Sequence, residues 1–181
     1  KTLGSFILID KITNLTVATG VINFKPRKSD NVKWELTDIN QENRSKLLGN
    51  KPKLLWFTGL SGAGKSTIAN QLEIALHKKG ILTYMLDGDN LRHGLNQDLG
   101  FSEEDRIENL RRVGEVAKLF IDAGIYTIAS FISPFRKDRD NIRAFFPEGR
   151  FLEIYVKTNI EDAVKRDPKG LYKKALKGDI P

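Results

Sequence analysis

The sequence predicts an α/β fold in which a mostly parallel sheet carries helices on both faces. Three observations lead to this prediction. From residue 53 onward, short apolar runs alternate with segments whose apolar residues recur at the spacing of one helical face. Glycines follow several of these segments, as they commonly do at helix ends. Alternation of strands and helices is typical of parallel sheets whose crossover helices cover both faces.

The first 25 residues differ in character from the rest of the chain. Residues 5–9 and 15–24 are rich in Ile, Val, Thr and Phe, and turn-forming residues separate them. They are predicted to form two β-strands. Since an isolated hairpin is only marginally stable in water, we expect this piece to need a partner, either the rest of the chain or a β-domain upstream.

A linker and a short helix follow the hairpin. Residues 25–33 are polar and basic, a composition typical of linkers. Residues 37–48 are predicted to form a helix that ends at Gly49. Its N-cap is expected to be Thr37 or Asp38, because the side chains of both residue types accept hydrogen bonds from a first helical turn.

Beyond residue 53 the alternating pattern defines the remaining strands and helices. Ser102, followed by Asp105 three residues later, resembles a capping box and predicts the start of the longest helix. The predicted strands are residues 54–58, 81–86, 125–133 and 151–158. The predicted helices are residues 65–79, 102–124, 138–146 and 159–166.

The composition excludes several classes of function. The 181 residues include no cysteine, which excludes a disulfide scaffold, a thiolate-zinc site, a thiol nucleophile and an iron–sulfur cluster. Apolar runs fall far short of the ~20 residues that cross a bilayer, and no signal-peptide pattern opens the chain, so we expect a cytoplasmic protein without a membrane partner. The 30 Lys and Arg residues against 23 Asp and Glu residues, a net charge of +7, favour polyanionic partners.

The segment after the first strand of the alternating region matches the phosphate-binding pattern G-x-x-x-x-G-K-[ST]. Its residues are Gly59, Leu60, Ser61, Gly62, Ala63, Gly64, Lys65 and Ser66, followed by Thr67. The pattern lies between a predicted strand and a predicted helix, as it must to bind phosphates. Lys65 would reach the outer phosphates and Ser66 would ligate Mg2+. The sequence therefore predicts a nucleotide triphosphate site in a P-loop NTPase-type three-layer α/β/α fold.

A regulatory GTPase is disfavoured. Such a protein also needs an Asn-Lys-x-Asp motif to read the base, and residues 50–53 lack the Asp and precede the phosphate loop. The D-x-x-G spacing of residues 167–170 lies after the last predicted strand instead of after an early one.

A second candidate motif, D-G-D-N-L-R, occupies residues 87–92 at the end of the next strand. Ligands of parallel sheets bind beyond the carboxyl ends of the strands. Asp87 and Asp89 could hold magnesium-bound water or accept a proton from an attacking hydroxyl, and Arg92 could bind an anion. The alternative interpretation is a turn without function.

Residues at the start of the long helix are further candidates for ligand binding, and each has a purely structural alternative. Its polar face includes Arg106, Asn109, Arg111 and Arg112, and a charged helix face is more often simply solvated. Phe101, just before the helix, could belong to the core or stack on a base.

Five motifs, in order along the chain, carry a resemblance to a known family. They are G-L-S-G-A-G-K-S-T, D-G-D-N-L-R, G-F-S-E-E-D-R-I-E-N-L-R-R-V-G-E-V-A-K-L-F, S-F-I-S-P-F-R and D-P-K-G-L-Y-K-K-A, within residues 31–181. Together they resemble the adenylylsulfate kinases. These enzymes of sulfate assimilation transfer the γ-phosphate of ATP to the 3′-hydroxyl of adenylylsulfate and release 3′-phosphoadenylylsulfate and ADP. The resemblance implies the same activity here.

The resemblance also implies roles for the matching residues. The phosphate loop, residues 59–67, would bind ATP, with Ser66 and Asp87 at Mg2+ and Asp89 as the base near the 3′-hydroxyl. The residues implied to bind adenylylsulfate are Asp89, Asn90, Arg92, Phe101, Arg106, Asn109, Ile132, Ser133 and Lys169, the last on a basic lid. The candidate catalytic residues are Lys65, Asp87, Asp89 and Ser133.

Ser133 has two interpretations. It matches a serine described as a phosphorylated intermediate in some members of the family. In-line transfer between two bound nucleotides does not require such an intermediate. The alternative is a serine at a strand end whose backbone shapes the acceptor pocket.

The hairpin has a resemblance of its own. L-G-S-F-I-L-I-D and T-N-L-T-V-A-T-G-V-I are similar to the end of the last β-barrel in the GTPase-like large subunit of sulfate adenylyltransferase, which is fused to adenylylsulfate kinase in some bacteria. We therefore expect residues 1–25 to be a barrel remnant, 26–52 a linker and N-terminal helix, and 53–181 the kinase domain. In the family an F-T-G stretch follows K-G-L-Y-K-K-A, so we expect a truncated C-terminal end.

The expected partners are ATP, adenylylsulfate, fused or associated sulfate adenylyltransferase subunits and a second copy of the chain in a homodimer, without nucleic acid. Two alternatives remain: a P-loop kinase for another small acceptor, and a non-catalytic nucleotide-binding module that regulates sulfate adenylyltransferase. The presence of Lys65, Ser66, Asp87 and Asp89 argues against the non-catalytic module.

Overall fold

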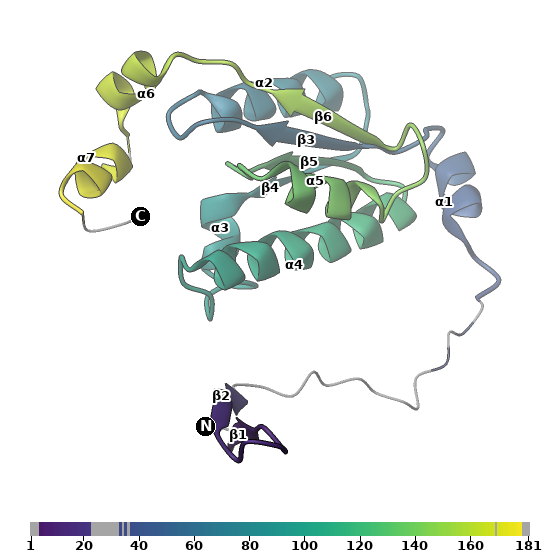
Figure 1. The fold of residues 1–181 in the computed structure, drawn as a ribbon. Coiled ribbons are helices and arrows are strands. Elements are labelled where there is room, and N and C mark those ends of the chain that lie inside the picture. Colours follow the sequence, from purple (N-terminus) through teal and green to yellow (C-terminus); the bar gives the residue numbers. More distant parts are fainter. Residues whose placement is uncertain (1–3, 23–32, 34, 36, 169, 179–181) are drawn as a thin grey trace. The chain divides into compact units, whose positions relative to one another are not determined.

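The computed structural model describes residues 4–22, 33, 35, 37–168 and 170–178 (Figure 1). The chain forms two compact units, Lys1–Thr37 and Asp38–Pro181. The first holds a β-hairpin and the second an α/β fold. The domain boundaries expected near residues 25 and 52 stay a prediction.

The hairpin pairs β1 (Gly4–Ile9) antiparallel to β2 (Thr16–Ile22), as the sequence predicts. Its turn is held by the carboxylate of Asp10, which accepts hydrogen bonds from the backbone N–H groups of Ile12 and Thr13. Several apolar side chains of this unit are more than half exposed: Ile7, Leu8, Ile9, Ile12, Leu15 and Val17. This exposure agrees with a hairpin that requires a partner. Residues 23–24 of the predicted second strand, and most of the linker, lie outside the described residues.

The larger unit contains the predicted parallel sheet. Its strands are β3 (Leu54–Thr58), β4 (Thr83–Asp87), β5 (Tyr126–Ser130) and β6 (Phe151–Tyr155). They follow the order β4-β5-β3-β6, and every neighbouring pair is parallel. The predicted α/β class is therefore confirmed.

β5 is shorter than the sequence predicts: it was predicted to reach Ser133 but ends at Ser130. Phe131 still donates its N–H to the carbonyl oxygen of Phe57, at 3.1 Å. Beyond it Ser133 has a φ of +35°, which is incompatible with an extended strand. β6 likewise ends at Tyr155, short of the predicted residue 158, and β4 starts at Thr83 instead of residue 81.

Alternate side chains of β3 face opposite sides of the sheet. Leu54 and Trp56 pack against α4 (Glu103–Asp122) and α5 (Arg136–Arg143), whereas Leu55 and Phe57 pack against α2 (Lys65–His77). Figure 1 shows α2 on one side of the sheet and α4 and α5 on the other. The three layers of the predicted architecture are therefore present, each closed by its own apolar cluster.

The first helix starts later than the sequence predicts. α1 (Gln41–Leu47) is capped by Asn40, whose side chain accepts from the N–H groups of Glu42 and Asn43 while Asn43 returns a bond to Asn40. The predicted caps Thr37 and Asp38 were therefore wrong, because this reciprocal pair satisfies the first turn.

The start of α4 was predicted correctly at Ser102, whose hydroxyl accepts from the N–H of Asp105. In a complete capping box the side chain of Asp105 would accept from the N–H of Ser102. Here the Asp105 carboxylate accepts from the N–H of Gly100 instead.

The remaining helices are α3 (Gly88–Arg92), α6 (Ile160–Arg166) and α7 (Leu171–Leu176). The sequence predicted α6 but neither α3 nor α7. α2 ends at His77, two residues before the predicted end, and α5 starts and ends earlier than predicted. Among the described residues, no helix combines the length and apolarity that a bilayer crossing requires.

Candidate active site

The phosphate-binding loop joins β3 to α2 and depends on glycine at two places. Gly59 has a φ of +144°, and a Cβ there would lie 2.6 Å from the carbonyl oxygen of Val156. Gly62 has a φ of +74°, and its Cβ would lie 3.1 Å from the carbonyl oxygen of Ala163. α2 then begins without a side-chain cap, so the N–H groups of its first turn are available to an anion.

Lys65 lies inside this loop. Its side chain is buried, and its Nζ donates to the carbonyl oxygens of Gly59, at 2.9 Å, and Leu60, at 2.8 Å. The ammonium group thus sits where the loop would enclose a phosphate chain. This is the position that the sequence pattern predicts for a phosphate-binding lysine.

Three strand or helix ends meet beside the loop. Ser66 Oγ donates to Asp87 Oδ2, at 2.8 Å, and lies 3.1 Å from Ser130 Oγ. Ser130 ends β5, the strand between β4 and β3, so its hydroxyl lies at the same edge of the sheet. Ser130 is not among the predicted site residues, because the predicted strand continues three residues beyond it.

This cluster suits a magnesium ion that is shared with a bound phosphate. Hydroxyl and carboxylate oxygens are the ligands that Mg2+ prefers, and Mg2+ usually binds proteins through one or two of them plus substrate phosphates and water. Ser66 and Asp87 supply such a pair. The part of the chain that the structure describes contains no group of three or more Asp, Glu, His or Cys side chains that could form a complete metal cage.

Residues 88–92 of the D-G-D-N-L-R motif form the short helix α3. Asp87 caps it by accepting from the N–H of Asp89, at 3.0 Å, with the oxygen that does not contact Ser66. Asp89 and Arg92 are three residues apart and so lie on one side of the helix. The same carboxylate therefore joins the phosphate loop to the element that carries the predicted acceptor-binding residues.

Arg92 and Phe101 form a platform at the end of α3. Arg92 Nη1 donates to the carbonyl oxygens of Leu99 and Gly100, both at 2.9 Å, and its guanidinium lies 4.4 Å from the centre of the Phe101 ring. Phe101 is 61% exposed, which excludes the core alternative for its side chain. Asn90 is exposed on the same short helix.

Two predicted residues of α4 lie behind this platform. Arg106 Nε donates to the carbonyl oxygen of Phe101, at 3.0 Å. Asn109 is buried, and its Oδ1 accepts from the side-chain amide of Asn96, at 2.9 Å. Asn96 is fully buried and was not anticipated, because a lone asparagine in a loop gives no sequence signal of burial.

Ser133 points its hydroxyl into the core. The indole N–H of Trp56 donates to Ser133 Oγ, at 3.0 Å, and Ser133 donates to Thr58 Oγ1, also at 3.0 Å. Thr58 in turn donates to the carbonyl oxygen of Ile132, at 2.8 Å. The Ser133 hydroxyl thus links the side chains of Trp56 and Thr58, next to the backbone of residues 132–133.

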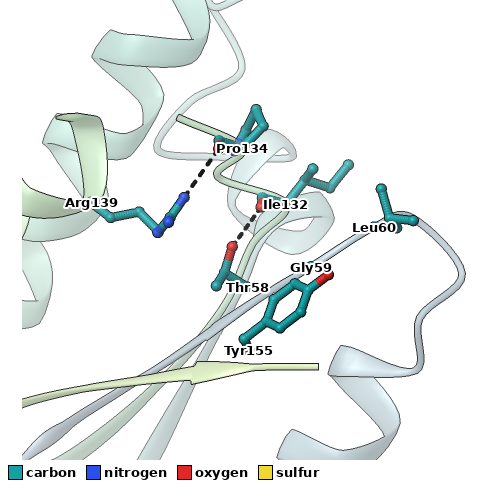
Figure 2. Close-up of a pocket in the computed structure, with 7 residues that line it drawn as sticks. All are labelled: Thr58, Gly59, Leu60, Ile132, Pro134, Arg139 and Tyr155. Atoms are coloured by element: carbon teal, nitrogen blue, oxygen red, sulfur yellow. Dashed lines mark hydrogen bonds between the residues drawn. The ribbon is translucent and has the colours of Figure 1, made fainter. Parts of the chain in front are cut away.

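A cavity of about 230 Å³ opens beside the first residues of the phosphate loop (Figure 2). Its walls are formed by Thr58, Gly59, Leu60, Ile132, Pro134, Arg139 and Tyr155. Arg139 anchors one wall by donating to the carbonyl oxygens of Ser133 and Pro134 and to the carboxylate of Glu153. Arg139 and Tyr155 were not predicted, since neither lies in a phosphate-binding pattern.

The C-terminal helices contact the phosphate loop directly. Tyr172 Oη donates to the carbonyl oxygen of Ser61, at 3.0 Å, and Arg166 Nη1 reaches that of Gly62, at 3.4 Å. Burial, and secondarily the charge of Asp167, raises the pKa of Tyr172, so its phenol keeps its proton. Asp167 also accepts from the N–H groups of Tyr172 and Lys173. Lys169, the predicted lid lysine, lies outside the described residues.

Comparisons with known proteins agree with the family that the sequence resembles. The family model described as Adenylylsulphate kinase matches residues 51–181. The chain is 56% identical over 180 residues to a Bifunctional enzyme NodQ of Rhizobium meliloti, covering 99% of this chain and 28% of the relative. It thus spans little more than a quarter of the length of the bifunctional relatives.

Shorter relatives match the larger unit. An Adenylyl-sulfate kinase of a Shewanella species is 60% identical over 150 residues, covering 83% of this chain and 73% of the relative. Among solved structures, the Mycobacterium tuberculosis APS kinase CysC in complex with AMPPNP and APS is 50% identical, with a TM-score of 0.69, and the match covers 72% of this chain and 77% of that one.

Proposed function

Because the chain belongs to the adenylylsulfate kinase family, we propose that it transfers the γ-phosphate of ATP to the 3′-hydroxyl of adenylylsulfate. The products are 3′-phosphoadenylylsulfate and ADP. The observation that carries the proposal is the contact between Ser66 and Asp87. It joins a phosphate loop to a helix that displays Asp89 and Arg92, so that donor and acceptor sites adjoin.

On the donor side, residues 59–67 hold the phosphates of ATP. The N–H groups of the loop and of the first turn of α2 donate to phosphate oxygens. Lys65, already inside the loop, exchanges its two carbonyl partners for the outer phosphates. Ser66 and Asp87 hold Mg2+, which neutralises phosphate charge when bound.

On the acceptor side, Asp89 accepts the proton of the 3′-hydroxyl as the oxygen attacks the γ-phosphorus. The new bond joins O3′ to phosphorus, and the bond from phosphorus to the bridging oxygen of ADP breaks in line with it. Phe101 stacks on the adenine of adenylylsulfate, and its exposed ring supports this role. The remaining acceptor contacts come from Asn90, Arg92, Arg106, Asn109, the backbone at residues 132–133, and Lys169.

Transfer proceeds directly between the two nucleotides, without a phosphorylated Ser133. The support for this part is the position of the serine hydroxyl, which is buried between Trp56 and Thr58. A serine nucleophile would need both an exposed hydroxyl and a base within hydrogen-bond reach.

We also propose that the chain works as part of a larger bifunctional protein with sulfate adenylyltransferase, in the cytoplasm and as a homodimer. The similarity to bifunctional relatives across the hairpin, and its exposed apolar side chains, support the fusion. Size measurement in solution tests the dimer.

The test of the function is ADP release from ATP with a panel of acceptors: adenylylsulfate, a nucleoside monophosphate and a sugar acid. We expect adenylylsulfate to stimulate turnover far above the others. A preference for another acceptor would favour a different P-loop kinase. No stimulation by any acceptor would favour a regulatory module.

A further inference from the structure

Residues 93–101 connect α3 to α4 and end in Phe101, the exposed ring of the acceptor platform. The backbone of this connection reaches Arg92 only at its far end, through the carbonyl oxygens of Leu99 and Gly100. Two residues of α4 hold the backbone next to the ring, since Asp105 accepts from the N–H of Gly100 and Arg106 donates to the carbonyl oxygen of Phe101. The position of the ring depends on these contacts and on what holds the rest of the connection in place.

One side chain from the middle of α4 holds it. Arg112 Nη1 and Nη2 donate to the two carboxylate oxygens of Asp98, at 2.6 and 2.8 Å. Nη1 also donates to the carbonyl oxygen of Leu95, at 3.0 Å. The paired geometry fixes orientation as well as distance, which a single hydrogen bond or a lysine could not do.

Arg112 is itself held by its own helix. Its Nε donates to Glu108 Oε1, at 2.9 Å, so all three guanidinium nitrogens are engaged. The hydrogen bonds from Arg111 and Arg112, first among them that of Arg111, lower the pKa of Glu108 to about 2. The carboxylate is therefore charged at neutral pH, and the fork of Arg112 is oriented before any ligand binds.

A buried contact supports the same connection. Asn96, which lies between Leu95 and Asp98, donates its side-chain N–H to Asn109 on α4. The connection is thus fastened to α4 at Leu95, Asn96, Asp98, Gly100 and Phe101. It is fastened to α3 at Leu99 and Gly100, and at Asn96, whose N–H donates to the carbonyl oxygen of Leu91.

Arg111 provides an internal contrast. It also pairs with Glu108, at 2.7 Å, and its side chain is half exposed. Both of the described hydrogen bonds of Arg111 go to Glu108 and not to the connection, so removal of Arg111 takes away a charge and a Glu108 partner but leaves residues 93–101 fastened.

We propose that Arg112 is a positioning residue for the acceptor nucleotide: by holding Leu95 and Asp98 on α4, it fixes the connection that presents Phe101 and the carbonyl partners of Arg92. This inference rests on the proposed function. It predicts that loss of Arg112 weakens the binding of adenylylsulfate but not of ATP, because the phosphate loop and its contacts with Lys65 and Tyr172 do not involve residues 93–101.

The kinetic test compares Arg112→Gln and Asp98→Asn with the matched control Arg111→Gln. If only about a third to a tenth of the variant molecules keep residues 93–101 in the arrangement that binds the acceptor, the KM for adenylylsulfate rises about threefold to tenfold. The KM for ATP and the kcat should stay within about twofold, since the chemistry and donor site are unchanged. Exchange of the charges in the double variant D98R/R112D should recover part of the loss.

The inference is wrong if Arg111→Gln and Arg112→Gln have equal effects, or if both KM values rise together. Amide hydrogen exchange gives a second readout that does not need turnover. Residues 93–101 should exchange faster in Arg112→Gln than in the parent or in Arg111→Gln, and equal exchange would overturn the inference. Failure of the proposed function would appear in the parent itself, as no transfer to adenylylsulfate, whereas failure of this inference appears only between variants.

Discussion

Ser133→Ala separates the two interpretations of this serine. The substitution removes one oxygen that accepts from the buried indole N–H of Trp56 and donates to Thr58. Thr58 keeps its own acceptor, the carbonyl oxygen of Ile132, so only the indole N–H loses its partner. Since Trp56 is fully buried, water cannot replace the lost oxygen without rearrangement.

The structural cost follows from that single orphaned donor. An unsatisfied buried donor costs about 1–3 kcal/mol, so the free energy of unfolding should fall by that amount. For a chain of this size, each kcal/mol corresponds to about 2–4 °C in Tm. The kcat should fall by less than about tenfold, through slight movement of the backbone at residues 132–133, because the hydroxyl takes no part in direct transfer.

The assay measures Tm by calorimetry and kcat with saturating ATP and adenylylsulfate. A second measurement incubates the parent with γ-labelled ATP alone, and we expect no label on Ser133. An obligatory phosphoserine would instead lower kcat by about 10³-fold or more in Ser133→Ala and would label the parent protein. Either result would refute the direct mechanism.

Three further predictions concern other parts of the site. Lys65→Ala should lower kcat by about 10²–10³-fold, as expected for loss of one preorganised donor to the transition state, while the circular dichroism spectrum stays unchanged; an unfolded variant would contradict the phosphate role. Tyr172→Phe should raise the KM for ATP by a few-fold without changing that for adenylylsulfate, since it removes the hydrogen bond to the phosphate loop at Ser61; equal KM changes would contradict this. Glu108→Gln should make the stability of the protein less sensitive to acid. The lowered pKa of Glu108 contributes stability that is complete above its ordinary value of 4.5 and is lost as the pH falls towards about 2. The Tm between pH 5 and 2 should therefore fall less steeply in the variant than in the parent.

The location of the predicted donor half of the site depends mainly on local patterns. The glycines and lysine of the phosphate loop lie within one short segment of the sequence, and Lys65 donates to carbonyl oxygens of that same segment. The four parallel strands and the apolar faces of α2 and α4 were likewise readable, because each depends on the periodicity of one segment, although the ends of β5 and β6 were predicted three residues too late.

The acceptor half depended on contacts between distant segments. α3 was missed because D-G-D-N is rich in turn-forming residues, and its cap, Asp87, is oriented by Ser66 from another element. The role of Arg112 could not be read from the sequence either, since a charged helix face is usually solvated. Only the fold brings Asp98 back to it.

Transfer of phosphate to the 3′-hydroxyl of adenylylsulfate can be observed in its products. The most direct measurement is phosphorus NMR of the products formed from ATP and adenylylsulfate by the protein with Mg2+. We expect ADP and one new phosphomonoester resonance, from a phosphate on the 3′ oxygen, in equal amounts and with the sulfate linkage intact. ADP with inorganic phosphate alone, or a phosphate on any other atom, would contradict it.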